Sequence, residues 1–197
     1  MFKILRRRTV FSRTVTPTAL SLKVGFIKEC RKHPDADKLY VSKIITSPEL
    51  INASELTDTS QYLTVCSGLA NHVPIEEMIN RKIVLLTNLK ASKMRGIKSE
   101  AMVLAAEIKS SEGSTEVEIV NAPKSSALGE RLFFKPFLYD KEPTKLKSKV
   151  WEDLQANLFT NNEGVVIYRS EGEDHELSSE NSNDTAFVNR LVNAKVR

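Results

Sequence analysis

The fold is decided by one stretch, NHVPIEEMIN, at positions 71–80. Pro74 suits the first turn of a helix because its missing N–H would find no partner there. The two acids that follow Ile75 suit the positive end of a helix, and Asn80 can end it. The stretch therefore predicts one short helix.

Strand patterns lie on both sides of this helix. Apolar and polar residues alternate in 22–27, whereas 82–88 is nearly all apolar, so both faces of that strand should be covered. Residues 46–61 are polar and predict a long loop. We expect strands at about 22–27, 39–45, 62–66, 82–88, 102–107 and 116–120. Five or six short strands with a short helix between the third and fourth indicate a mainly β fold in the order of the OB-fold Greek-key barrel, and another small β-barrel is the alternative.

The residue pattern of the sequence changes after Phe137. Residues 139–149 are charged, apolar residues then recur at helical spacing from Val150 to Leu158, and 165–168 has a strand pattern. We expect a small helix and strand appendage at 138–178 that packs on a barrel at 22–137. Because residues 171–184 hold six acids and no Lys or Arg, we expect the tail at 179–197 to be disordered.

Composition excludes several classes of protein. The 197 residues are 41% hydrophobic, and no stretch approaches the roughly 20 apolar residues that span a bilayer, so we expect no membrane association. Basic residues exceed acidic ones by 29 to 25, which gives a net charge of +4. Cys30 and Cys66 form no CxxC pair, which fits a reducing compartment.

The N-terminal segment at 1–21 differs from the rest of the chain. It is basic and rich in Ser and Thr, and the first acid of the chain is Glu29. This composition is typical of a mitochondrial transit peptide, so we expect a mitochondrial protein. The alternative is a basic arm that adds nonspecific RNA affinity to a cytoplasmic protein.

A basic run marks the candidate binding site. Six cations and no acid lie between Glu77 and Glu100, on or beside a loop that borders the nucleic-acid face of an OB-fold. Lys and Arg can neutralise phosphates, and Ser and Asn can donate to phosphate, 2′-OH or base edges. The alternative is a solvated charged loop. The candidate RNA-binding residues are Ser67, Asn71, Arg81, Asn88, Lys90, Ser92, Lys93, Arg95, Lys98 and Ser99.

The aromatic content of 7% argues against a single-strand binder that stacks bases on exposed rings. It favours recognition of shape and backbone in a folded RNA.

The sequence gives little support for a catalytic site or a metal site. His33, Asp35 and Asp37 could place three ligands together, but no further His or Cys cluster completes a metal site, so we expect a turn braced by Asp–backbone hydrogen bonds. A Cys66–His72 nucleophilic pair would lack an orienting third group. We therefore expect no enzyme activity, no metal and no cofactor.

Six short segments together form a specific signature. They are KVG at 23–25, KHPDADKLYV at 32–41, SGL at 67–69, VP at 73–74, NLK at 88–90 and KMRG at 93–96. Over about 22–177 the chain resembles the tRNA-binding domain family of endothelial monocyte-activating polypeptide II. The resemblance implies an OB-fold, tRNA binding with little sequence preference, and partnership with aminoacyl-tRNA synthetases. Residues 149–168 also resemble the eukaryotic appendage that mimics a dimer interface, which implies a monomer.

The sequence departs from the family at two places. The loop at 46–61 is longer than the family's usual turn, and Lys90-Ala91-Ser92-Lys93 stands where Lys-Pro-Ala-Lys is common. We expect a noncatalytic tRNA-binding protein, and the resemblance implies a role as a synthetase cofactor. One alternative is an interaction scaffold of a synthetase or translation complex with little RNA binding of its own. The other is a hydrolase that uses Cys66 or His33.

Overall fold

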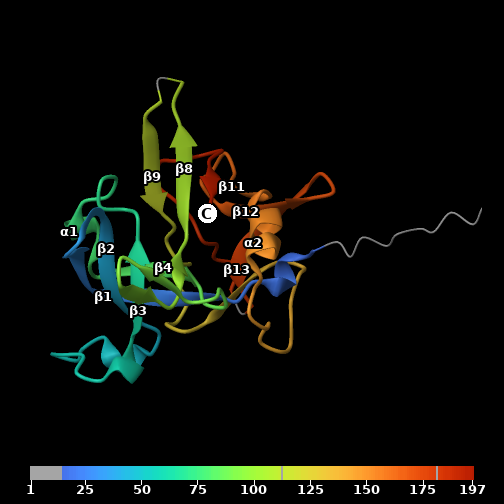
Figure 1. Ribbon diagram of the computed structural model, residues 1–197. Coiled ribbons are helices and arrows are strands. Elements are labelled where there is room, and N and C mark those ends of the chain that lie inside the picture. The colour runs from blue at the N-terminus through green and yellow to red at the C-terminus, as the bar shows by residue number, and fades with distance from the viewer. Residues whose placement is uncertain (1–14, 112, 181) are drawn as a thin grey trace, which may run out of the picture.

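The computed structural model describes residues 15–111, 113–180 and 182–197, and shows a barrel with an appendage against one side (Figure 1). Most of the basic segment at 1–21 lies outside the described residues. Up to residue 119, the elements in chain order are η1 (Pro17–Ala19), β1 (Leu22–His33), β2 (Ala36–Ile45), η2 (Pro48–Leu50), η3 (Thr59–Gln61), β3 (Leu63–Ser67), α1 (Ile75–Met78), β4 (Arg81–Leu86), β5 (Ser92–Met94), β6 (Ile97–Ser99), β7 (Met102–Val103), β8 (Ala105–Lys109) and β9 (Thr115–Ile119). The remaining elements are β10 (Arg131–Phe134), α2 (Ser148–Gln155), β11 (Leu158–Thr160), β12 (Val166–Ser170), β13 (Glu173–Ser179) and β14 (Lys195–Val196).

Strand β1 organises the barrel because it has antiparallel partners on both edges. Its first half pairs with β4 and its second half with β2, which in turn pairs with β3. Strand β4 pairs with β7, and the barrel closes where the Glu100 N–H, just before β7, donates to the Thr64 carbonyl of β3 at 2.9 Å. The expected small barrel, with short helix α1 between its third and fourth strands, is confirmed.

Strand β1 changes partners at Gly25. A Cβ at this position would lie 2.5 Å from Leu85 Cδ1 on β4 and 2.9 Å from Ile44 Cγ2 on β2. Both distances are below van der Waals contact, so a side chain here would separate the strands. The glycine therefore lets β1 lie close to β4 where the barrel curves.

Strand β4 has one face in each of two cores. Ile83 and Leu85 belong to the cluster inside the barrel, together with Met78 of α1. Val84 and Leu86 belong to the cluster between the barrel and the appendage. All four β4 side chains are fully buried, which confirms the expectation that both faces of this strand are covered.

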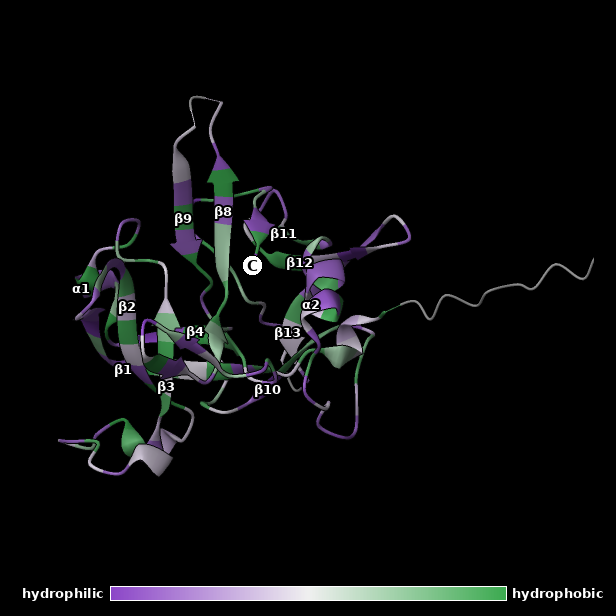
Figure 2. Cartoon of the chain, viewed as in Figure 1, coloured by the Kyte–Doolittle hydropathy of each residue, from purple (hydrophilic) through white to green (hydrophobic). Residues whose placement is uncertain are grey.

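The appendage packs α2 and strands β11–β13 against the outside of the barrel. Leu154 of α2 and Leu158 of β11 are fully buried in the shared cluster. The visible side of α2 is mostly hydrophilic in Figure 2, as expected for a helix with one buried face. Strand β13 pairs with β12 and, through β10, joins the appendage sheet to β1. Strand β10 was not expected from the sequence.

The expectation of a disordered tail at 179–197 is wrong for the described residues. Strand β14 pairs with β8 and β11, and Ala186, Leu191 and Val196 are buried. The carboxylate of Glu118 on β9 accepts hydrogen bonds from three successive tail N–H groups, those of residues 189, 190 and 191, at 2.6, 2.9 and 3.1 Å. Spaced apolar residues thus give the tail enough buried surface to fold, which the acid content of 171–184 concealed.

The connection at 46–61 is a loop with two single-turn 3-10 helices, η2 and η3, and it projects from the lower edge of the barrel in Figure 1. Within the described ranges, no helix has the length and hydrophobicity needed to cross a bilayer.

Candidate nucleic-acid interface

The basic run forms a two-stranded hairpin, β5–β6, rather than an irregular loop. Its turn residues Arg95 and Gly96 have φ values of 48° and 92°. Positive φ at both central positions defines a type I′ turn, whose twist suits a tight hairpin. The turn places Arg95 at the exposed tip of the hairpin.

Three cations of this hairpin region have free side chains. Lys90, Lys93 and Arg95 are exposed, and in the described part of the chain no hydrogen bond or ion pair holds their charged groups. Lys93 lies directly opposite Lys98 in the hairpin register. Like charges at such positions repel, so a polyanion that binds here would relieve an unfavourable interaction.

Lys98 is partly neutralised by Glu100, whose carboxylate lies 3.0 Å from the Lys98 Nζ. Burial alone would raise the pKa of Glu100, but the Thr64 N–H and Lys98 outweigh it, so the pKa lies below its ordinary value. Glu100 therefore stays ionised at neutral pH and fixes Lys98 against the barrel.

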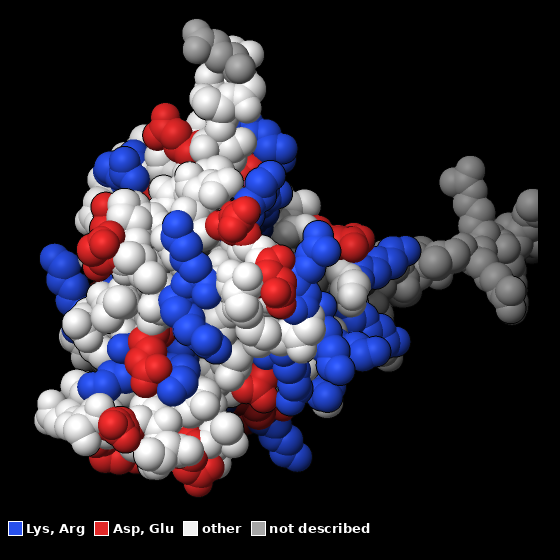
Figure 3. Space-filling model, turned by 60° about the vertical axis from the view of Figure 1, so that its left-hand side comes forward, with Lys and Arg blue, Asp and Glu red and all other residues white. Residues whose placement is uncertain are grey.

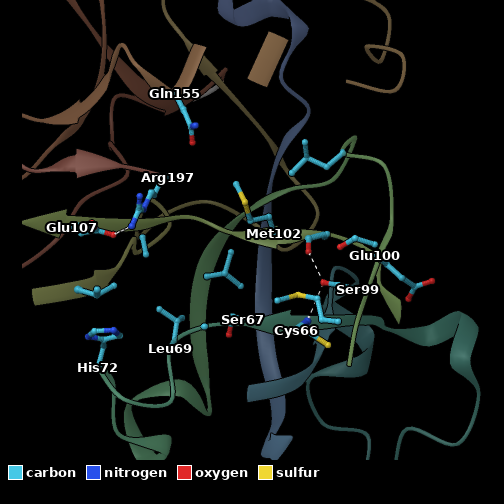
Figure 4. Close-up of a pocket in the computed structure, with 18 of the residues that line it drawn as sticks. Cys66, Ser67, Leu69, His72, Ser99, Glu100, Met102, Glu107, Gln155 and Arg197 are labelled. Carbon is cyan, nitrogen blue, oxygen red and sulfur yellow. Dashed lines mark hydrogen bonds and ion pairs between the residues drawn. The ribbon is translucent and has the colours of Figure 1, made fainter. Parts of the chain in front are cut away.

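The hairpin forms one rim of a groove of about 630 Å³. Lys90 and Ser92 line that rim, and Ser67 and Leu69 line the opposite rim at the end of β3. Figure 4 shows that Glu107, Arg197 and Gln155 close a further side, with Arg197 ion-paired to Glu107. The floor is mostly apolar: Ala101, Met102, Val103, Ala105 and Val117. The groove therefore combines an apolar floor with a polar and basic rim.

Ser67 and Asn71 come from the rim opposite the hairpin. The Ser67 Oγ is buried in the groove wall with no hydrogen-bond partner among the described residues. Asn71 is exposed in the turn that follows β3. The structure thus brings Ser67, Ser92 and Lys90 to one groove, with Asn71 just outside it.

The structure does not support Asn88 and Ser99 as RNA-binding residues, because both side chains are buried and hydrogen-bonded within the protein. The Asn88 amide donates to the carbonyls of Ala19 and Thr144, each at 2.8 Å, and accepts from the Ser21 N–H at 3.0 Å. The Ser99 hydroxyl accepts from the Cys66 N–H at 3.0 Å and donates to a carbonyl at 3.1 Å. Asn88 clamps three chain segments together, and Ser99 anchors the hairpin base to β3.

The Arg81 side chain is likewise held by partners within the protein. Its half-buried guanidinium donates to Asn121 Oδ1 at 2.9 Å, to the Ile119 carbonyl at 3.1 Å and to the Glu77 carbonyl at 3.3 Å. Burial lowers the pKa of Arg81, against the opposing effect of Glu118 and Glu77, and the group is held as a structural cation. It does not line the groove beside the hairpin.

The appendage contributes cations that sequence reasoning missed. The Leu146 N–H donates to the Asn88 carbonyl at 2.8 Å, and Leu146 forms a parallel β-bridge with Leu89. Lys145 and Lys147 flank this buried leucine and are exposed. The alternation of Lys and Leu at 145–147 is their signal in the sequence. The bridge between Leu89 and Leu146 joins segments far apart in the chain, so this signal alone could not place the two lysines near the hairpin. Figure 3 shows Lys and Arg side chains in the middle and at the lower right of one face, with acidic side chains between them.

The structure corrects the expected bracing of the turn at His33, Asp35 and Asp37. The Asp35 N–H donates to His33 Nδ1 at 3.0 Å, so the imidazole rather than an Asp carboxylate braces the turn. Across the described ranges, no three His, Cys, Asp or Glu side chains gather as metal ligands would. Burial raises the pKa of the Cys66 thiol, which disfavours the reactive thiolate.

Comparison with known proteins settles the family. A model of a putative tRNA-binding domain matches residues 22–131, which is more than half of the chain. The chain belongs to the tRNA-binding domain family. The match runs from the start of β1 to the start of β10 and includes the hairpin and groove, and it confirms the resemblance seen in the sequence motifs.

Individual relatives extend the similarity into the appendage. The chain is 46% identical over 156 residues to a probable methionine–tRNA ligase of Oryza sativa subsp. japonica, covering 79% of this chain and 18% of that protein. It is 42% identical over 161 residues to the aminoacyl tRNA synthase complex-interacting multifunctional protein 1 of Mus musculus, covering 80% and 46%. The chain thus spans less than half the length of these curated relatives.

A solved structure matches nearly the whole chain. The C-terminal domain of Plasmodium vivax p43 superposes with a TM-score of 0.72 at 26% identity, covering 93% of this chain and 99% of that one. The tRNA-binding domain and its appendage therefore share their arrangement with that protein.

Proposed function

We propose that this chain is a noncatalytic tRNA-binding protein that holds a folded RNA on the β5–β6 hairpin and the groove beside it. One observation carries the proposal: Lys90 at the groove rim and Lys93 and Arg95 on the adjoining hairpin are exposed, in a chain of the tRNA-binding domain family, and no hydrogen bond or ion pair among the described residues holds their charged groups. Free cations that face solvent can release counterions from phosphates, which supplies most of the affinity of such proteins.

The groove favours recognition of backbone and shape over stacking of many bases. Among the described residues that line it there is no Phe, Tyr or Trp. Single-strand binders rely on exposed rings of this kind. We therefore expect affinity for many tRNA species and little preference for base sequence.

The appendage supports a monomeric protein. Val84, Leu86 and Leu104 on the outside of the barrel are fully buried by the chain's own appendage rather than left for a second copy.

We also propose that aminoacyl-tRNA synthetases are partners of this protein and that it acts as their cofactor. Support comes from the relatives, which include a methionine–tRNA ligase and a protein named for its interaction with the synthetase complex. A pull-down should recover synthetases after nuclease treatment if the contact is direct. Loss of every synthetase from the nuclease-treated sample would contradict a direct partnership.

For the N-terminal segment we propose mitochondrial import, on the basis of its acid-free basic composition. A fluorescent fusion of residues 1–30 should enter mitochondria. A fusion in which the arginines at 6, 7 and 8 are replaced by Glu is the control and should stay outside, and a wild-type fusion that stays in the cytosol would refute the proposal.

The main test removes the free cations together. Replacing Lys90, Lys93 and Arg95 by Ala should weaken tRNA binding at least about tenfold and lower the slope of log K against log salt by about one for each phosphate that the variant no longer neutralises. Three exposed cations that do not line the groove, Lys124, Lys135 and Arg190, provide a triple-Ala control of equal charge change. Equal affinity and equal salt slope in both triple variants would refute the proposed site.

A further inference from the structure

The turn between β1 and β2 is joined to the β5–β6 hairpin by a buried side chain. His33 is 4% exposed, and its Nε2 lies 3.1 Å from the carbonyl oxygen of Met94. Its other ring nitrogen, Nδ1, lies 3.0 Å from the backbone nitrogen of Asp35. One imidazole thus joins its own turn to the strand that ends at the hairpin tip.

These two partners fix the protonation state of the ring. A carbonyl oxygen can only accept, so Nε2 carries the hydrogen, and a backbone N–H can only donate, so Nδ1 carries a lone pair. His33 is therefore the neutral Nε2–H tautomer with both nitrogens engaged. It adds no charge to the surface, so any effect it has on RNA must act through geometry.

The hairpin needs such support at its tip. Each of its strands has three residues, and an isolated two-stranded hairpin of that length is barely stable in water. Its base is anchored on β3 by Ser99 and by the residue after it, Glu100, which exchanges hydrogen bonds with Thr64. At the tip, the bond from His33 reaches Met94, the residue directly before Arg95.

A shared pocket also shows that the two hairpins are neighbours. Arg31 of β1 and Ile97 of β6 line the same small surface pocket of about 260 Å³. The β1–β2 and β5–β6 hairpins therefore border the same pocket, and the hydrogen bond from His33 to Met94 joins them on the buried side.

We infer that His33 is a positioning residue for RNA binding, and that its bond to Met94 fixes where the hairpin presents Lys93 and Arg95 to the phosphates. The inference rests on the proposed function, because it assigns to His33 the alignment of that same site. Both cations stay in the chain when the bond is broken, but they no longer match the spacing of the phosphates.

Two substitutions separate the two bonds of the ring. The amide of Asn reaches the place of Nδ1, so His33→Asn keeps an acceptor for Asp35 and removes the link to Met94. The amide of Gln reaches the place of Nε2, so His33→Gln keeps a donor for Met94 and removes the acceptor for Asp35. We expect His33→Asn to weaken tRNA binding roughly tenfold, the effect of about one phosphate left without its cation, and His33→Gln to stay within about twofold of wild type. Equal affinity of His33→Asn and wild type would overturn the inference.

A double-mutant comparison tests whether His33 acts through the hairpin. In the background of Lys93→Ala/Arg95→Ala, adding His33→Asn should cost less than about twofold, because the cations it positions are already absent. A full additional loss in that background would show that His33 acts elsewhere. If the Lys93→Ala/Arg95→Ala variant itself binds tRNA like wild type, the proposed function fails. If only that variant loses affinity and His33→Asn does not, the inference alone fails.

Hydrogen exchange distinguishes positioning from loss of fold. In His33→Asn, the amides of residues 92–99 should exchange faster while those of β1, β2 and β4 keep the wild-type rate. His33→Gln should match wild type throughout. Faster exchange over the whole barrel in His33→Asn would contradict a positioning role and indicate general destabilisation.

Discussion

The two ends of the basic run at 81–98 have similar composition and opposite environments. At the first end, Arg81 donates three hydrogen bonds, and the Lys82 Nζ donates to the Lys124 and Ser126 carbonyls at 2.7 and 2.9 Å. At the other end, Lys93 and Arg95 project from the β5–β6 hairpin with no such acceptors among the described residues.

A cation contributes differently to the protein in these two environments. A cation surrounded by protein carbonyls has already exchanged its water for fixed partners, so it stabilises the fold and has little left to offer a phosphate. A cation on a hairpin keeps its water and counterions, which RNA can displace. The acceptors nearby, rather than the number of Lys and Arg residues, distinguish a structural cation from a binding one.

The largest effect on stability should come from Arg81→Ala. It leaves the Ile119 carbonyl and the Asn121 amide without a donor, so the free energy of unfolding should fall by about 2 kcal/mol. Urea unfolding measures the loss. At a temperature where the variant remains folded, its tRNA affinity and salt slope should equal those of wild type.

Arg81→Lys is the matched control, since it keeps the charge and loses the planar fork that reaches several acceptors. Its stability should lie between those of wild type and Arg81→Ala. A drop in the salt slope of tRNA binding in Arg81→Ala alone would place this corner in the RNA interface and break the distinction between the two ends.

A smaller effect on stability should appear at acid pH, where protonation of Glu100 breaks its link between Lys98 and the barrel. Because the folded-state pKa of Glu100 lies below its unfolded value, its contribution to stability is present at neutral pH and is lost as the pH falls through the folded pKa. Wild type should therefore lose more stability than Glu100→Gln between about pH 5 and pH 3. Glu116→Gln, which removes an exposed carboxylate of β9, is the control and should follow wild type. Identical acid sensitivity of wild type and Glu100→Gln would show that the carboxylate does not support the hairpin.

The smallest effect should come from relieving the repulsion between Lys93 and Lys98. Lys93→Ala should raise the free energy of unfolding of the RNA-free protein by about 0.3 kcal/mol at low salt, because like charges opposite each other in a hairpin destabilise it. The same variant should bind tRNA more weakly. Thermal melting at low and high salt checks the first effect, and a destabilised Lys93→Ala variant would mean that Lys93 already has a structural role.

The sequence predicted the barrel better than it predicted the site. Local periodicity and the helix at 75–78 indicated the barrel, because those signals depend on neighbouring residues. The roles of Arg81, Asn88 and Ser99 depend on partners more than 30 residues away, so a count of polar groups could not separate them from free donors. The folded tail was missed for the same reason, since its acceptor is Glu118 on a distant strand.

If tRNA covers the hairpin end of the basic run, it should shield the lysines there from chemical modification. Acetylation of lysines with and without saturating tRNA, read residue by residue by mass spectrometry, measures this. We expect tRNA to protect Lys90, Lys93 and Lys98 and to leave Lys124 and Lys135 equally reactive in both samples. Equal acetylation of the hairpin lysines with and without saturating tRNA would show that tRNA binds elsewhere.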